Sequence, residues 1–254
     1  MADQGGAEVI LLHAIDPERQ RASLDCAVSR ARQQLEAFGA ESFHKPDAGL
    51  SFSVEVEEGD PPECVLRCAA DKNADLIMIS SLGHCNLLGG GAARIVNSAD
   101  CSVWTPGHAA NSSYGYVPNP EPKTVLAALD LMPTASELLC FVRRFCDERR
   151  IRPELIHSVA MPVAVPMRRF DYEYRDYLIG KGQTGLKWLQ QEAGTDYPVC
   201  VAPGEIAGLI RGTALRQQAD LLIMGRGPAQ HLRGRLNGHS YSILRECPCP
   251  VLSI

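Results

Sequence analysis

The sequence lacks the features of several large protein classes. No apolar run approaches the ~20 residues of a membrane-spanning helix, and no basic-then-apolar signal peptide opens the chain. Its ten cysteines include no CxxC pair. The formal net charge of −5 argues against a general nucleic-acid binder. We therefore expect a cytoplasmic protein with reduced thiols that binds neither membranes nor nucleic acid.

Catalytic signatures are missing as well. The chain contains no GxGxxG, Walker A, HExxH or GxSxG pattern, and the run from Gly238 to Ser242 lacks the second glycine of a nucleophile elbow. Cys64 and Cys68 would share a helix face, as metal ligands can, but no second pair completes a metal site. We expect these two thiols in the core, no metal held by the protein, and no enzymatic activity.

What the sequence does contain is a long internal repeat. Matching segments recur in the same order at offsets of 144 or 145 residues: Ala74–Ile79 with Ala219–Met224, Gly59 with Gly204, and Leu11–Ala14 with Leu155–Ser158. This period is far longer than that of solenoid repeats, so each unit should fold around its own core. We predict a first domain at 1–107, a proline-rich linker at 108–121 and a second domain at 122–254.

Each half alternates short apolar strands with amphipathic helices. This pattern predicts the α/β class, with a parallel sheet covered by helices on both faces. The continuous apolar runs Leu76–Ile79 and Leu221–Met224 are typical of central strands buried on both sides. His13 and His157 lie at matching places within strands, and we interpret both as hydrogen-bonded core histidines.

The offset also exposes a gap. The second half opens with the strand Val125–Asp130 and a helix near Ser136–Arg150, and subtracting 144 places their counterparts before Met1. A start assigned too far downstream, a shortened segment and a true loss would each explain this gap, and the sequence does not separate them.

Three segments of the second half are predicted to meet beyond the carboxyl ends of the strands. Asp130 follows the first strand, where its carboxylate would accept hydrogen bonds from a base or a ribose; a turn residue bonded to nearby amides is an equal alternative. Thr134 and Glu137 have the spacing of a capping box. Glycines favour close backbone approach, and helix N-termini favour phosphate. The predicted ligand-binding residues are Asp130, Met224, Gly225, Gly227, Asn237, Gly238, His239 and Ser240.

Positive charge gathers in the same region. Residues 1–110 contain 8 basic and 16 acidic residues, whereas residues 111–254 contain 17 and 14. No acidic residue occurs from 225 to 245, a stretch that holds Arg226, His231, Arg233 and Arg235. This pattern suits a polyphosphate ligand, and a solvated loop is the alternative.

Together these segments resemble the universal stress protein family, as a tandem member whose first domain is incomplete at its N-terminus. The resemblance rests on Gly6–Pro17, Val54–Pro61, Ala74–Met78, Val125–Asp130, Ala219–Gly225 and Cys247–Leu252. It implies two flavodoxin-like (adenine nucleotide alpha hydrolase-like) doubly wound parallel-sheet domains of five strands each. It also implies a pseudo-dimer of the two domains in which Ser102–Trp104 pairs with Val251–Ile254. A homodimer of the whole chain is a further option for its assembly.

The resemblance leaves the ligand open. Some members bind ATP, through an aspartate after strand 1 and a G-x-x-G-x9-G-[S/T] pattern, and others lack the pattern and bind no nucleotide. Here the second half has Gly225-x-Gly227, nine residues, and then Asn237-Gly238, while the first half has Ser80-Ser81-Leu82-Gly83 and no strand-1 aspartate. We expect no nucleotide in the first half. For the second half, binding of an adenine nucleotide (ATP with magnesium), a ligand-free interaction module and a hydrolase of the wider group remain alternatives.

The missing strand has a consequence in this fold, where strand 1 is central and lies next to strand 4. Its absence would leave buried backbone groups unpaired, which is costly. We therefore expect the first sheet to close by shifting a strand or by pairing with a strand of another chain.

Overall fold

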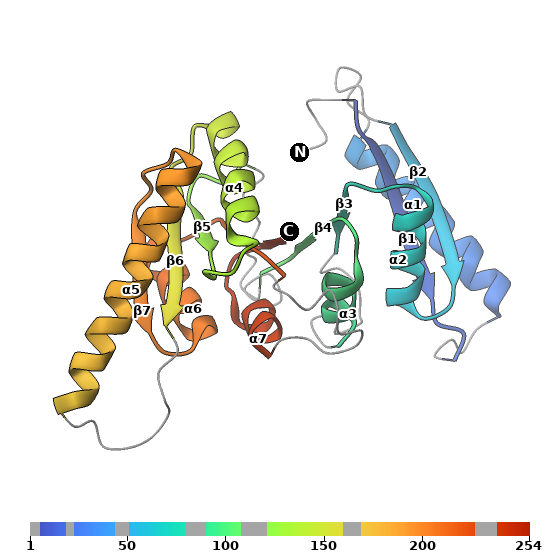
Figure 1. Ribbon diagram of the computed structural model, residues 1–254. Helices are drawn as coiled ribbons and strands as arrows, with labels where there is room; N and C mark the ends of the chain where they lie inside the picture. The colour runs from blue at the N-terminus through green and yellow to red at the C-terminus, as the bar shows by residue number, and fades with distance from the viewer. Residues whose placement is uncertain are drawn as a thin grey trace. The chain divides into compact units, whose positions relative to one another are not determined.

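The structure is a computed structural model that describes residues 6–18, 23–43, 51–79, 90–107, 121–159, 169–226 and 238–254, without the side chains of 90, 169–171, 238 and 239. The chain divides into two compact units, Met1–Ala74 and Asp75–Ile254. This division follows contacts in space, so the boundaries 1–107, 108–121 and 122–254 stay a prediction about the repeat. Figure 1 draws the first unit in blue to teal and the second in green to red.

The first unit consists of β1 (Glu8–Ile15), α1 (Leu24–Phe43), β2 (Ser51–Glu58) and α2 (Pro61–Asp71). β1 and β2 pair in parallel along their whole lengths. The backbone of α1 comes so close to β2 that a Cβ atom on Gly39 would lie 2.3 Å from the ring of Phe52. Cys64 and Cys68 of α2 are buried, which confirms their interpretation as core residues.

The second unit holds the other elements around one sheet. In chain order these are β3 (Leu76–Met78), α3 (Gly90–Ser98), β4 (Ser102–Thr105), β5 (Val125–Ala128), α4 (Ala135–Arg149), β6 (Glu154–Val159), α5 (Arg169–Ala193), β7 (Val199–Pro203), α6 (Ile206–Gln217), β8 (Leu221–Met224), α7 (Gly238–Glu246) and β9 (Val251–Ser253). The strand order is β3-β4-β9-β8-β5-β6-β7 (Figure 1). All neighbours are parallel except β4 and β9.

Helices cover both faces of this sheet, as a doubly wound fold requires. Alternate strand residues such as Ala127 and Ile223 pack against α4 and α5 in one core cluster. α6 and α7 pack against each other, and buried residues such as Ile210 and Leu244 belong to them. All four residues of β8 are buried, which confirms the central position predicted for Leu221–Met224.

The backbone repeats its local geometry at the predicted offset. Gly59 and Gly204 both have positive φ (142° and 121°), which glycine adopts readily. The amide of Gly59 donates to Ile15 at the end of β1, and that of Gly204 donates to Val159 at the end of β6. Asp60 and Glu205 then cap α2 and α6 through their side chains. The repeat seen in the sequence is therefore also a structural repeat.

The two halves are joined through their last strands. β4 and β9 pair antiparallel, with Val103 opposite Ser253 and Thr105 opposite Val251. This confirms the expected pairing of Ser102–Trp104 with Val251–Ile254. The halves thus share one sheet in the second unit.

The position of β3 corrects one prediction. Leu76–Ile79 was expected to be central and buried, but β3 is the end strand of the seven-stranded sheet and Met78 is 64% exposed. Among the described residues, β1 and β2 form a separate two-stranded sheet, and β4 is the strand that pairs with β3. In the second half, β5 takes the place next to β8 and separates β8 from β6.

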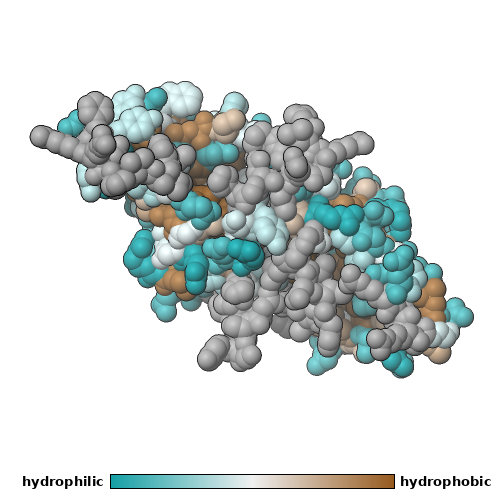
Figure 2. All heavy atoms as spheres, turned by 90° about the horizontal axis from the view of Figure 1, so that it is seen from below, coloured by the Kyte–Doolittle hydropathy of each residue, from teal (hydrophilic) through white to brown (hydrophobic). Residues whose placement is uncertain are grey.

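The surface is mixed in character. On the face shown in Figure 2, hydrophobic side chains lie among hydrophilic ones. No helix within the described ranges combines the length and the apolar character needed to cross a bilayer. The nine cysteines in these ranges are free thiols, in agreement with the absence of a disulfide pattern in the sequence.

Candidate functional site

The sheet reverses its winding direction between β5 and β8. From β5 the chain moves outward through β6 to β7, then returns to β8 and moves the opposite way to β9. β5 and β8 are parallel neighbours, with Ala128 opposite Met224. In open α/β sheets such a switch point leaves a crevice beyond the carboxyl ends of the two strands, where ligands bind.

Asp130 lies at this point, two residues after the end of β5, and its side chain is exposed. The residue before it is fixed by both of its backbone groups. The amide of Leu129 donates to Ile156 at 2.9 Å, and Nδ1 of His157 lies 2.8 Å from the carbonyl oxygen of Leu129. The predicted hydrogen bond of His157 is confirmed, although the residue is half-buried rather than fully in the core. The interpretation of His13 as a core histidine is wrong, because His13 is exposed.

A third contact holds the loop after Asp130, and sequence reasoning missed it. A Cβ atom on Gly185 of α5 would lie 2.6 Å from Cδ1 of Leu131. Leu131 therefore rests in the space that the glycine leaves open. Leu189 and Leu186 anchor this part of α5 in the core below. The only signal in the sequence is a glycine inside a long helix, which usually lowers helix stability.

The start of α4 differs from the predicted capping box. Thr134 is the N-cap, but it has helical dihedral angles (φ −76°, ψ −8°) and makes no capping hydrogen bond through its side chain. A capping residue normally has extended dihedral angles, which bring its oxygen over the first amides. The spacing of Thr134 and Glu137 was therefore a misleading signal.

Met224 is the last residue of β8, and Gly225 follows it. β8 pairs with β5, the strand that precedes Asp130. Met224 is buried, and Gly225 is half-buried without a positive φ. A Cβ atom on Gly225 would lie 3.4 Å from Cδ2 of Leu138 in α4. The glycine here allows α4 to pack closely against the end of β8.

Arg226 has a structural role that the charge pattern did not reveal. Its guanidinium donates to the carbonyl oxygens of Ala99 and Cys101, which connect α3 to β4. Nε of Arg226 is buried, and burial lowers the pKa of the guanidinium. Both terminal nitrogens of the guanidinium thus donate within the fold, which favours a structural role for Arg226.

The phosphate end of the predicted site is described only in part. α7 begins at Gly238, and Ser240 is buried in its first turn. Gly227 and Asn237 lie outside the described residues, as do His231, Arg233, Arg235 and the run from Ser80 to Gly83. The side chain of His239 is likewise not described. The α7 N-terminus nonetheless follows β8, so it offers its free amides on the carboxyl side of the sheet.

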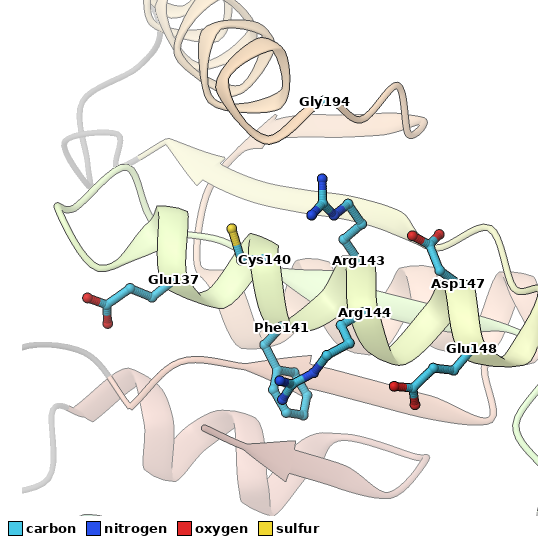
Figure 3. A pocket seen from close by; sticks show the side chains of 8 residues that line it. All are labelled: Glu137, Cys140, Phe141, Arg143, Arg144, Asp147, Glu148 and Gly194. Atoms are coloured by element: carbon cyan, nitrogen blue, oxygen red, sulfur yellow. The ribbon is translucent and has the colours of Figure 1, made fainter.

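A separate hollow of about 700 Å³ lies on the outer surface of α4. Figure 3 shows Cys140, Arg143 and Asp147 pointing to one side of the helix, and Phe141, Arg144 and Glu148 to the other. Arg143 donates to the carbonyl of Ala193 at 2.7 Å. The hollow contains none of the predicted site residues, and its side chains do not converge on a point. We therefore place the candidate site at the switch point.

The comparisons with known proteins agree with this architecture. The sequence profile of the universal stress protein family matches residues 1–105 and 121–254. A universal stress protein from Archaeoglobus fulgidus DSM 4304 is 18% identical, with a TM-score of 0.60, over 97% of this chain and 85% of that chain. A functionally unknown protein from Pseudomonas aeruginosa PAO1 is 13% identical, with a TM-score of 0.62, over 98% of this chain and 82% of that chain.

A smaller family protein, from Arabidopsis thaliana with AMP bound, is similar over 52% of this chain and 91% of that chain, at 18% identity and a TM-score of 0.35. No curated protein sequence matches this chain. The family profile covers both halves and leaves out only a short stretch between them. The chain therefore belongs to the universal stress protein family.

Proposed function

We propose that this universal stress protein binds an adenine nucleotide in its second half, in the crevice beyond the ends of β5 and β8. One observation carries the proposal. The exposed carboxylate of Asp130 stands at the reversal of strand order, on a loop held by His157 and Gly185. A carboxylate in a fixed position accepts hydrogen bonds from an adenine amino group or from ribose hydroxyls.

The phosphates would lie toward the start of α7, where free amides and the helix dipole favour negative charge. Within the described ranges, no three histidine, cysteine, aspartate or glutamate side chains gather into a metal site. Magnesium would therefore enter on the phosphates of ATP, with most of its ligands from phosphate and water. The Arabidopsis thaliana protein has AMP bound, so AMP is tested beside ATP and ADP.

The direct test is calorimetric titration of the full chain with ATP, ADP and AMP. We expect saturable binding of at least one nucleotide. Asp130→Ala should weaken it by about 10- to 100-fold, since a hydrogen bond to a charged group contributes about 1.5–3 kcal/mol. Asp196→Ala is the matched control, because this exposed aspartate precedes β7 and so lies at the opposite, amino-terminal edge of the sheet.

A ligand-free interaction module is the second candidate function, and two observations favour it. Arg226 donates to backbone carbonyls, and Ser240 is buried, so two of the groups expected near phosphate are less accessible to a ligand. A flat titration for all three nucleotides, with a folded protein, would overturn nucleotide binding and favour this alternative.

We propose that the protein turns ATP over slowly or not at all. Release of inorganic phosphate in the presence of ATP and Mg²⁺ measures this directly. Fast turnover that Asp130→Ala abolishes would instead identify a hydrolase. The free state of the nine described cysteines supports a cytoplasmic location, which fractionation of cells can check.

A further inference from the structure

Two buried thiols meet between the last helix and the last strand. Cys247 follows α7 directly, and Cys249 lies two residues before β9, with Pro248 between the two cysteines. Their Sγ atoms are 3.6 Å apart and share a hydrogen bond. Cys247 is 1% exposed and Cys249 is 2% exposed. The proposed nucleotide binding makes no use of this pair.

The local backbone brings the two sulfur atoms together. The amide of Cys247 donates to the carbonyl of Ile243 at 2.8 Å, so the hydrogen bonding of α7 extends to this residue. The chain then bends at Pro248 and Cys249. In an extended chain, side chains two residues apart are separated by about 6.6 Å, and the bend removes much of this distance. The Cys-Pro-Cys segment therefore builds a dithiol within one turn of the chain.

A disulfide is within reach of this geometry. The sulfur atoms would have to approach from 3.6 Å to about 2.0 Å, and rotation about each Cα–Cβ bond moves a sulfur atom without moving the backbone. The ring closed by this bond contains a single intervening residue, Pro248, so the bond would be strained and easily reduced. Disulfides of this kind are the labile ones that respond to redox conditions.

The hydrogen bond between the thiols gives them different roles. Cys249 donates its S–H to the sulfur of Cys247, and this bond lowers the pKa of the Cys247 thiol. The same bond, together with burial, raises the pKa of Cys249, which keeps its proton. Since the thiolate is the nucleophile, Cys247 is the sulfur that attacks an oxidant, and Cys249 is the sulfur that completes the disulfide.

We propose that Cys247 and Cys249 form a redox-active dithiol, which hydrogen peroxide oxidises to a reversible disulfide. Hydrogen peroxide is a small molecule, and helix ends open locally at a low cost in free energy. Brief opening at the end of α7 therefore admits this oxidant to thiols that are buried in the average structure.

The reaction balances in two steps. The Cys247 thiolate attacks one peroxide oxygen; an S–O bond forms, the O–O bond breaks, and the departing hydroxide takes up the proton that Cys247 released, which gives water. Sγ of Cys249 then attacks the sulfenic acid of Cys247; the S–S bond forms, the S–O bond breaks, and the hydroxyl group leaves as water with the proton of Cys249. The two sulfur atoms together lose two electrons, which hydrogen peroxide gains.

The disulfide would affect the junction of the two halves. Gly107 lies two residues after β4, and a Cβ atom on it would be 2.4 Å from the carbonyl oxygen of Pro248 and 2.5 Å from the carbonyl carbon of Cys249. The Cys-Pro-Cys segment thus packs directly on the chain that leaves β4, with no room to shift toward it. Because the new bond would pull on this segment, we expect oxidation to weaken the packing beside the β4–β9 pair.

Mass spectrometry tests the disulfide directly, because trypsin places both thiols in one peptide, residues 246–254, with no other cysteine. The reduced full chain is treated with hydrogen peroxide, denatured in iodoacetamide to block remaining thiols, and digested. We expect this peptide to be two hydrogen atoms lighter than the dithiol and free of alkyl groups, and dithiothreitol should restore the dithiol. Cys146 in peptide 145–149 is the matched control, because it is equally buried and no thiol contributes to its pKa; it should be oxidised at least about tenfold less.

Variants with one thiol of the pair assign the roles. In Cys249→Ser the sulfenic acid of Cys247 has no neighbouring thiol, so dimedone should label Cys247. Cys247→Ser removes the attacking thiolate, and dimedone should label Cys249 at least about tenfold less. Circular dichroism checks that both variants are folded.

A urea titration tests the effect on the junction. The peroxide-treated chain should unfold at a lower urea concentration than the reduced chain, and dithiothreitol should reverse the change. Cys247→Ser treated in the same way is the control for oxidation of the other cysteines, and its unfolding midpoint should stay nearly constant.

Three outcomes would overturn the proposal. Peptide 246–254 stays a dithiol at peroxide concentrations that oxidise the exposed Cys140. Alternatively, the two thiols are oxidised separately to sulfinic acids, or no faster than Cys146. In the third outcome, peroxide shifts the unfolding midpoint of Cys247→Ser as much as that of the unchanged chain, which would show that other thiols carry the effect.

Discussion

Nδ1 of His157 lies 2.8 Å from the carbonyl oxygen of Leu129, and this bond ties β6 to the residue that precedes Asp130. The amide of Leu129 donates to Ile156 in the same strand. Both backbone groups of Leu129 are therefore held by β6. The position of the Asp130 carboxylate follows from the sheet and not from the loop alone.

Replacement of this imidazole should loosen the loop. In His157→Phe the Leu129 carbonyl loses its side-chain partner, and we expect the free energy of unfolding to fall by about 1 kcal/mol in a urea titration. Nucleotide affinity should fall with it. His13→Phe is the matched control at the same place of the repeat; because His13 is exposed, its replacement should change stability by less than about 0.5 kcal/mol. Equal effects of the two changes would contradict this account.

Two glycines of α5 should respond differently to alanine. In Gly180→Ala the new methyl group meets no atom within 4 Å, so we expect a gain of about 0.5–1 kcal/mol in thermal unfolding, with unchanged nucleotide affinity. In Gly185→Ala the methyl group displaces Leu131. The end of Leu131 is flexible, and its side chain is 42% exposed, so stability should change little while nucleotide binding weakens. Identical affinities for the two variants would show that Leu131 does not position the site.

Arg226 should act on stability and not on nucleotide affinity. Arg226→Met leaves the carbonyl groups of Ala99 and Cys101 without their donors, and we expect a loss of about 2–3 kcal/mol in the free energy of unfolding. Arg211→Met, at an exposed position of α6, should cost less than about 0.5 kcal/mol. If Arg226→Met instead abolished ATP binding in a protein of unchanged stability, Arg226 would be a phosphate ligand.

The two cysteines of α4 should differ strongly in reactivity. Burial raises the pKa of Cys146 to about 12, and Cys140 is exposed on the same helix. Because the thiolate is the nucleophile, Cys146 should resist iodoacetamide at pH 8 while Cys140 is alkylated, as mass spectrometry of tryptic peptides would show. Comparable labelling of both thiols in the folded chain would contradict the burial of Cys146.

The raised pKa of Cys146 also predicts a dependence of stability on pH. The folded chain keeps a proton that the unfolded chain loses above the ordinary pKa of 9.0, so the unfolded state binds fewer protons in this range. The contribution of Cys146 is thus complete below pH 9 and is lost as the pH rises toward about 12. Cys146→Ala should be less stable at pH 8 but should lose stability less steeply above pH 9. Parallel pH profiles would refute this.

The sequence predicted secondary structure well wherever apolar residues recur with the spacing of a strand or a helix. Strand β8 was predicted from its continuous apolar run Leu221–Met224. The pairing of β4 with β9, in contrast, followed from the family resemblance, because no local pattern identifies a partner more than a hundred residues away. Asp130 was placed correctly after β5, although its role at the site stays a prediction.

The misses have a common physical origin in contacts between distant segments. Arg226 binds backbone carbonyls, which every residue possesses, so the identities of Ala99 and Cys101 gave no signal. Gly185 meets Leu131 only after α5 has packed against β6, β7 and α4. The apolar run of β3 matches that of β8, yet only the presence of a second neighbour decides whether such a strand is central.

The antiparallel pair β4–β9 forms within one polypeptide. Two single-domain chains would have to associate to form the same pair of strands. Thr105 and Val251 face each other across this pair, and the side chain of Thr105 also donates to the carbonyl of Val251. Because both strands belong to one polypeptide, they meet at an effective concentration that does not depend on how much protein is present. Dilution cannot separate them, so this junction persists at any cellular abundance of the protein.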